Sequence, residues 1–87
     1  MAKSREALLA HLQDRPKHCT LKDVGDALEA YGFSYKRRGN THVWQNRGFV
    51  VVLHSPHEKF VKRGAVEEAI TNIELVEQAR RTGNGSP

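Results

Sequence analysis

The sequence is poor in cysteine and in long apolar runs. Cys19 is the one cysteine among 87 residues, so an internal disulfide and a zinc site built from several cysteines are both excluded. No apolar stretch approaches the roughly 20 residues that a membrane-spanning helix requires. Glu6, His11 and Gln13 interrupt the short apolar patch near the N-terminus, and no small-residue cleavage site follows it. We therefore expect no signal peptide, a cytoplasmic location and a single domain.

Acidic residues are scarce in the middle of the chain. Residues 31–64 hold all six aromatic residues and seven bases, but only one acid, Glu58. The net charge of this stretch is +6, whereas the rest of the chain, with seven bases and nine acids, has a net charge of −2. Positive charge concentrated in this way is typical of a surface that binds phosphate. The seven bases are Lys36, Arg37, Arg38, Arg47, Lys59, Lys62 and Arg63.

Capping residues and apolar spacing predict three helices. Ser4 can cap a helix of about ten residues that Pro16 ends. Thr20 and Asp23 form a capping-box pattern at the start of a second helix, which Gly32 ends. A continuous apolar stripe predicts a third helix over 64–81. The remaining residues, 82–87, are expected to be a disordered tail.

Between the second and third helices, the pattern predicts three strands. Alternating residues after Phe33, a turn at Gly39-Asn40, the stretch 41–45, a turn at 46–48 and the apolar run 49–53 form two hairpins. The expected fold is α+β, with the order α-β-β-β-α, a three-stranded antiparallel sheet, helices on one face and an extra short N-terminal helix. Residues 1–19 are the helical extension and residues 20–81 the domain. Double-stranded-RNA-binding domains share this element order.

The second strand places His42 and Trp44 on one face and Val43 on the other, because successive side chains alternate. The apolar character of Val43 predicts that it faces the helices and that His42 points away from them. Trp44 then has two interpretations: it stacks on an unpaired base, or it packs in the core.

Several short motifs resemble the HicA/YcfA family of small toxin mRNA interferases. Members have a first helix ending in Gly-Phe or Gly-Trp, a basic strand, a Gly-Ser-His motif, a valine-rich strand near a Pro-His pair, and Lys-x-Gly before the last helix. Here the corresponding residues run in this order over about 20–75: Gly32-Phe33, Lys36-Arg37-Arg38, Asn40-Thr41-His42, Val50-Val51-Val52, Pro56-His57 and Lys62-Arg63-Gly64. Counting from Phe33 places His42 at the family's histidine, whereas counting from Gly39 places Thr41 there; the first register is preferred.

The resemblance implies a toxin of a type II toxin–antitoxin pair, a metal-independent endoribonuclease that a HicB-like antitoxin neutralises. His42 would be the general base and His57 a second proton-transfer group, with no cofactor. A metal held by His42, His54 and His57 is disfavoured, because Glu58 is the only carboxylate near them. The expected RNA contacts are Lys36, Arg37, Arg38, Trp44, Arg47, Lys59, Lys62 and Arg63.

Other functions remain open from the sequence. A non-catalytic RNA- or DNA-binding module would keep the fold and the basic surface but lack the catalytic general base. The altered Asn40-Thr41-His42 motif favours this alternative. A protein-interaction domain would have to explain why bases and aromatic residues are concentrated together. Self-association is also open, as is a solvated surface role for the basic loop around Lys59.

Overall fold

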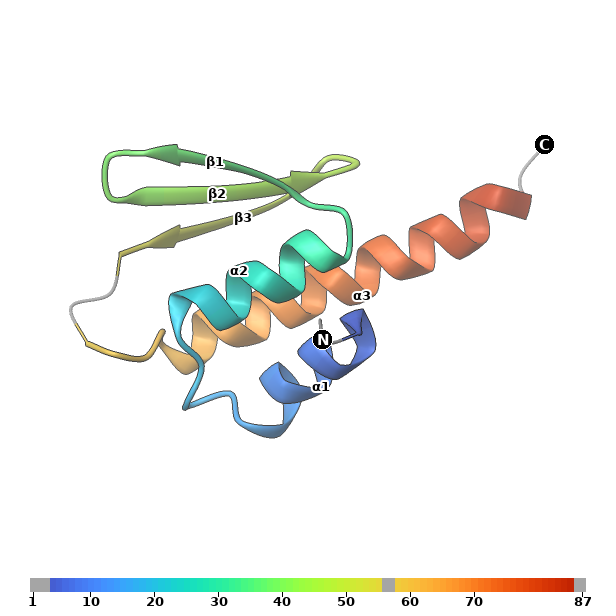
Figure 1. Cartoon of the computed structure of the whole chain (residues 1–87). Helices are drawn as coiled ribbons and strands as arrows, with labels where there is room; N and C mark the ends of the chain where they lie inside the picture. Colours follow the sequence, from blue (N-terminus) through green and yellow to red (C-terminus); the bar gives the residue numbers. More distant parts are fainter. Residues whose placement is uncertain (1–3, 56–57, 86–87) are drawn as a thin grey trace.

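A computed structural model of the protein describes residues 4–55 and 58–85, and its architecture is α+β (Figure 1). Three helices and one three-stranded antiparallel sheet follow one another along the chain in the predicted order. The elements are α1 (Arg5–Asp14), α2 (Leu21–Ala30), β1 (Ser34–Arg38), β2 (Thr41–Asn46), β3 (Phe49–His54) and α3 (Arg63–Gly85). Among the described residues, none of the helices combines the length and the apolar character that spanning a membrane needs.

The predicted helix caps are confirmed. The Ser4 hydroxyl accepts a hydrogen bond from the backbone N–H of Ala7 at 3.1 Å. At the start of α2, the Asp23 N–H donates to the Thr20 hydroxyl at 3.1 Å, and the Thr20 N–H donates to the Asp23 carboxylate at 3.0 Å. Gly32 follows α2 with a φ of 90°, where a residue with a Cβ would be strained. These features fix where α2 begins and ends.

Two tight turns join the strands in the order β1-β2-β3. Gly39 adopts a φ of 60° in the first turn, as expected, while Arg47 and Gly48 adopt 51° and 87° in the second. In the second turn both central residues have positive φ values, as in a type I′ hairpin turn, whereas in the first turn Gly39 does and Asn40 does not. The pairing has no bulge, so the register continues unbroken through both hairpins.

The helices lie on one face of the sheet in two layers (Figure 1). The α2 and α3 helices pack under the sheet, and α1 packs on their far side, in contact with both. None of the described helices covers the other face of the sheet, which we call the open face. The core between the layers contains Leu28, Val51 and Ile73, each fully buried, and Leu12 of α1 is buried as well.

The prediction that Val43 faces the helices is wrong. Trp44 and His42 are the inward residues of β2, with 2% and 6% of their surface exposed, and Val43 lies on the open face. Alternation left only the choice between the two faces, and the large indole buries more apolar area than valine does. The apolar sequence of β3 did not indicate which face of the sheet is buried, because its residues are apolar on both faces. Val51 and Leu53 are buried, while Val50 and Val52 are 45% exposed.

The last helix is longer than predicted. It begins at Arg63 and continues to Gly85, four residues beyond the predicted end at Arg81. Extending an existing helix fixes only one further residue at a time, so glycine weakens this end without stopping it as proline would. Part of the segment assigned to a disordered tail is therefore helical.

Candidate nucleic-acid interface

His42 lies at the edge of the buried layer and uses both ring nitrogens. Its Nδ1 is 2.8 Å from the Tyr35 hydroxyl, and its Nε2 is 2.9 Å from the Ser55 hydroxyl. Burial lowers the pKa of His42 below its usual value, and the nearby Arg37 lowers it further. The lowered pKa favours the neutral ring, but a ribose hydroxyl cannot reach either nitrogen without displacing one of these partners. In this arrangement His42 is not accessible as a general base, and its catalytic role stays a prediction.

The surface hollow next to His42 is also unfavourable for RNA binding. A hollow of about 250 Å³ lies between α2 and the sheet beside the rings of Tyr35, His42 and Trp44. Its α2 side carries two carboxylates, Asp26 and Glu29. One of them, Asp26, is paired with Lys22 at 2.8 Å. Carboxylates repel a phosphodiester, so this hollow is a poor place for a nucleic-acid backbone.

Trp44 belongs to the core, which confirms the second of its two interpretations. Its indole N–H donates to the Glu29 carboxylate at 3.3 Å, and its ring centroid is 5.1 Å from that of Tyr35. With 2% of its surface exposed, Trp44 cannot stack on an unpaired base. The predicted contact with RNA would require the indole to leave the core.

Three segments that are distant in the sequence lie toward the same end of the molecule (left in Figure 1): the β1–β2 turn, the start of α3, and the α1–α2 loop on the side of α2 and α3 away from the sheet. The Ser55 N–H donates to the Asn40 carbonyl at 2.8 Å and ties the exit of β3 to the turn. The Val61 N–H donates to the Cys19 carbonyl at 2.8 Å, and His18 packs edge-on against Phe60 at 5.3 Å. We call this end the basic end. Its bases are Arg15, Lys17, Arg37, Arg38, Lys59, Lys62 and Arg63.

The Lys and Arg side chains at the basic end differ in whether they have a partner within the chain. Arg37 donates to the Gly39 carbonyl at 2.8 Å, and Arg63 is paired with Glu67 at 3.3 Å, so each has a partner within the chain. Lys59 lies over the Phe60 ring at 5.3 Å, a contact that leaves its charge exposed. The Lys62 carbonyl accepts the first hydrogen bonds of α3, which puts this exposed side chain at the helix N-terminus. Cations there lie beside backbone N–H groups that favour anions.

Two of the residues predicted to contact RNA, Arg47 and Lys36, are not among the basic residues of the basic end. Arg47 occupies the β2–β3 turn at the opposite end of the sheet (Figure 1). Lys36 projects from the middle of β1 on the open face, in register with Val43. His57, the second predicted catalytic residue, lies outside the described residues.

Arg15 and Lys17 were missed by the sequence argument. They line a shallow surface hollow together with Arg63 and one acid, Asp14, although about 46 residues separate Lys17 from Arg63 along the chain. The bond between the Cys19 carbonyl and the Val61 N–H brings the segments together. The run Arg15-Pro16-Lys17-His18 was visible as a small basic cluster, but no local pattern indicated its neighbour.

The open face of the sheet contains a row of polar residues at the basic end. Arg38, Thr41 and His54 are cross-strand neighbours on β1, β2 and β3. The Thr41 hydroxyl is 3.4 Å from His54 Nδ1, and His54 is exposed. Next along this face, Val43 is paired with Val52 on one side and with Lys36 on the other.

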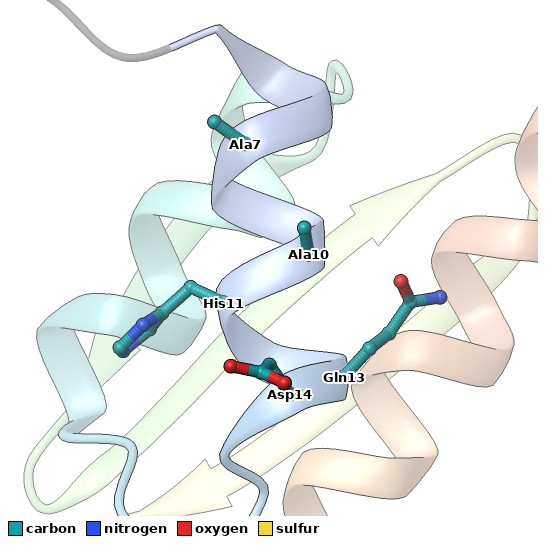
Figure 2. Close-up of a pocket in the computed structure, with 5 residues that line it drawn as sticks. All are labelled: Ala7, Ala10, His11, Gln13 and Asp14. Carbon is teal, nitrogen blue, oxygen red and sulfur yellow. The ribbon is translucent and has the colours of Figure 1, made fainter.

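A further hollow lies on the outer side of α1 (Figure 2). Ala7 and Ala10 form its small-residue part, while His11 points toward α2 and Gln13 toward α3. His11 Nε2 is 3.5 Å from the Asp23 carboxylate, and the Gln13 amide is 3.5 Å from the Glu74 carboxylate. These side chains attach α1 to both neighbouring helices, so we interpret the hollow as part of the helix packing.

Across the described residues, no three His, Cys, Asp or Glu side chains are grouped closely enough to hold a metal ion. In comparisons with known proteins, no family model, no curated protein and no solved structure matches the chain.

Proposed function

We propose that this protein binds RNA through the basic end. One observation carries the proposal: residues 15–17, 37–38 and 59–63 bring seven bases to one end of the fold, although the whole chain has a net charge of +4. The three strands contain no Asp or Glu, and helix α2 carries Asp26 and Glu29 beside His42, away from the basic end. Phosphate contacts supply most of the sequence-independent affinity for nucleic acid, so a charge distribution of this kind favours a phosphate-rich partner.

The arrangement of elements supports RNA over other polyanions. A hairpin turn and a helix N-terminus at one end of an α-β-β-β-α fold are the layout of double-stranded-RNA-binding domains, which recognise the shape of a duplex through its phosphates and 2′-hydroxyls. The motif resemblance to the HicA/YcfA family points to RNA as well. Both arguments are analogies, and the charge distribution is the physical basis to which they are added.

A charge-removal experiment tests the proposal. Replacing Lys59, Lys62 and Arg63 with Ala should weaken binding to a fluorescent RNA and reduce the slope of log K against log salt by about 0.7–0.9 for each phosphate that the variant no longer neutralises. The matched control replaces Arg5, Arg47 and Arg81, which lie away from the basic end. Arg5 is paired with Glu6 as Arg63 is with Glu67, so each triple variant removes one such ion pair. Equal affinity and slope in the two variants would refute the assignment.

RNA cleavage is the second candidate function, and a specific observation favours it: the basic end carries an exposed imidazole, His54, beside Arg38 and Thr41. In this case the protein would be the toxin of a pair, neutralised by a HicB-like antitoxin. Its expression alone should slow growth, and cleavage of RNA should persist in EDTA. Loss of cleavage on chelation would contradict the metal-independent mechanism.

A further inference from the structure

We propose that His54, and not His42, is the proton acceptor for RNA cleavage at the row Arg38–Thr41–His54. The inference rests on the proposed RNA binding at the basic end. Thr41 and His54 are paired directly across β2 and β3, and Arg38 is paired with Thr41 on the other side. Directly opposed residues project from the same face of a sheet, so the three side chains form one row on the open face.

The row has the groups that a phosphodiester requires. Neighbouring strands lie about 4.8 Å apart, so a phosphate above Thr41 is flanked by a guanidinium on one side and an imidazole on the other. The nine residues of the three strands that share this face include Lys36 and Arg38 but no Asp or Glu. A phosphate therefore meets positive charge here and no carboxylate from the strands, in contrast to the hollow beside His42.

Thr41 orients the imidazole. When His54 Nδ1–H donates to the Thr41 hydroxyl, across their 3.4 Å separation, Nε2 carries the lone pair of an exposed side chain. Thr41 is thus a positioning residue, and His54 the catalytic one. An imidazole nitrogen with a lone pair can accept the proton of a ribose hydroxyl.

The other described histidines are less suitable. His42 is buried, with both nitrogens occupied. His18 packs against Phe60, and His11 contacts Asp23 on the far side of α2. Of the four described histidines, only His54 is both exposed and in register with an arginine on the open face.

The reaction is an internal transesterification. The ribose 2′-oxygen attacks the adjacent phosphorus while its proton passes to His54 Nε2, and Arg38 stabilises the negative charge on the phosphorane oxygens. The bond from phosphorus to the 5′-oxygen then breaks, and the leaving oxygen takes a proton from water. His54 returns its proton to the resulting hydroxide. The products are a 2′,3′-cyclic phosphate and a 5′-hydroxyl, and no metal or other co-reactant is consumed.

The test measures RNA binding and cyclic-phosphate formation on the same proteins. His54→Gln should reduce cleavage about 10²- to 10⁴-fold, the usual loss for a positioned general base, while RNA affinity changes less than about threefold. Thr41→Val should lower the cleavage rate and Thr41→Ser should restore it, because only the hydroxyl holds the ring. His11→Gln is the control histidine, and circular dichroism confirms that each variant is folded.

The outcomes separate the two proposals. Wild-type protein that binds RNA without forming the cyclic phosphate refutes the role of His54 but leaves RNA binding intact. Cleavage that survives in His54→Gln and disappears in folded His42→Gln assigns the base to His42 instead. Wild-type protein that neither binds nor cuts RNA refutes both proposals. A DNA strand of the same sequence should remain uncut, since it lacks the attacking hydroxyl.

Discussion

Replacing Gly25 with Ala tests the packing that decides which face of β2 is buried. In an exposed helix, alanine is more favourable than glycine by about 1 kcal/mol. At Gly25, however, a Cβ would lie 2.9 Å from Cζ2 of Trp44, closer than two carbon atoms can approach without a shift. The indole is held by its bond to Glu29 and by burial, so it cannot move aside cheaply.

The expected size follows from these opposing effects. Overpacking a core typically costs about 1–3 kcal/mol, from which the helix gain of about 1 kcal/mol is subtracted. The net loss is up to about 2 kcal/mol, and in a domain of this size each 1 kcal/mol lowers Tm by about 4–8 °C. Gly64 of α3 is the matched control, because nothing lies within 4 Å of a Cβ added there.

Thermal unfolding followed by Trp44 fluorescence measures the effect directly, since Trp44 is the only tryptophan in the chain. Gly25→Ala should unfold at a lower temperature than the wild type and Gly64→Ala at the same or a higher one. If Gly25→Ala raises Tm as Gly64→Ala does, the indole does not lie against α2 and the assigned face of β2 is wrong.

Two further predictions concern stability. Thr20→Ala should lower the free energy of unfolding by about 1 kcal/mol, and Thr20→Ser should restore most of it, because the hydroxyl caps α2; equal urea midpoints for all three proteins would contradict the cap. The lowered pKa of His42 predicts that stability falls as pH drops below about 6.5, because the unfolded chain takes up a proton there before the folded chain does. Chemical denaturation between about pH 8 and pH 5 should show this loss, and His42→Gln should reduce its slope; an unchanged slope would mean that His42 does not carry the effect.

Local chemistry made most of the fold predictable. Ser4, Thr20 and Gly32 set helix ends through interactions within a few residues, and Gly39 permits the tight turn that the strand pattern requires. The side of the sheet that His42 faces was not predictable from alternation, which defines two faces without ranking them. Gly25 was the available signal, because a glycine inside a helix suggests a close neighbour, and that neighbour is Trp44.

The candidate site was predictable only in part. The concentration of bases over 31–64 was evident from composition, but Arg47 lies at the wrong end of the sheet, and Arg15 and Lys17 join from outside the stretch. Basic residues are brought together by long-range contacts such as the one between Cys19 and Val61, and such contacts leave no local pattern in the sequence. The row Arg38–Thr41–His54 likewise depends on strand register, and it became visible once both turns were placed.

Nuclear magnetic resonance offers the most direct test of the basic end as the RNA-binding surface. Titrating ¹⁵N-labelled protein with a short RNA duplex and with a single strand, at low salt, reports which backbone amides change. The proposed function predicts that the largest shifts fall at residues 15–18, 37–41 and 59–65, with little change at the Arg47 turn or along the outer side of α1. Shifts centred on Arg47 or on α1, or no shifts at all, would contradict it.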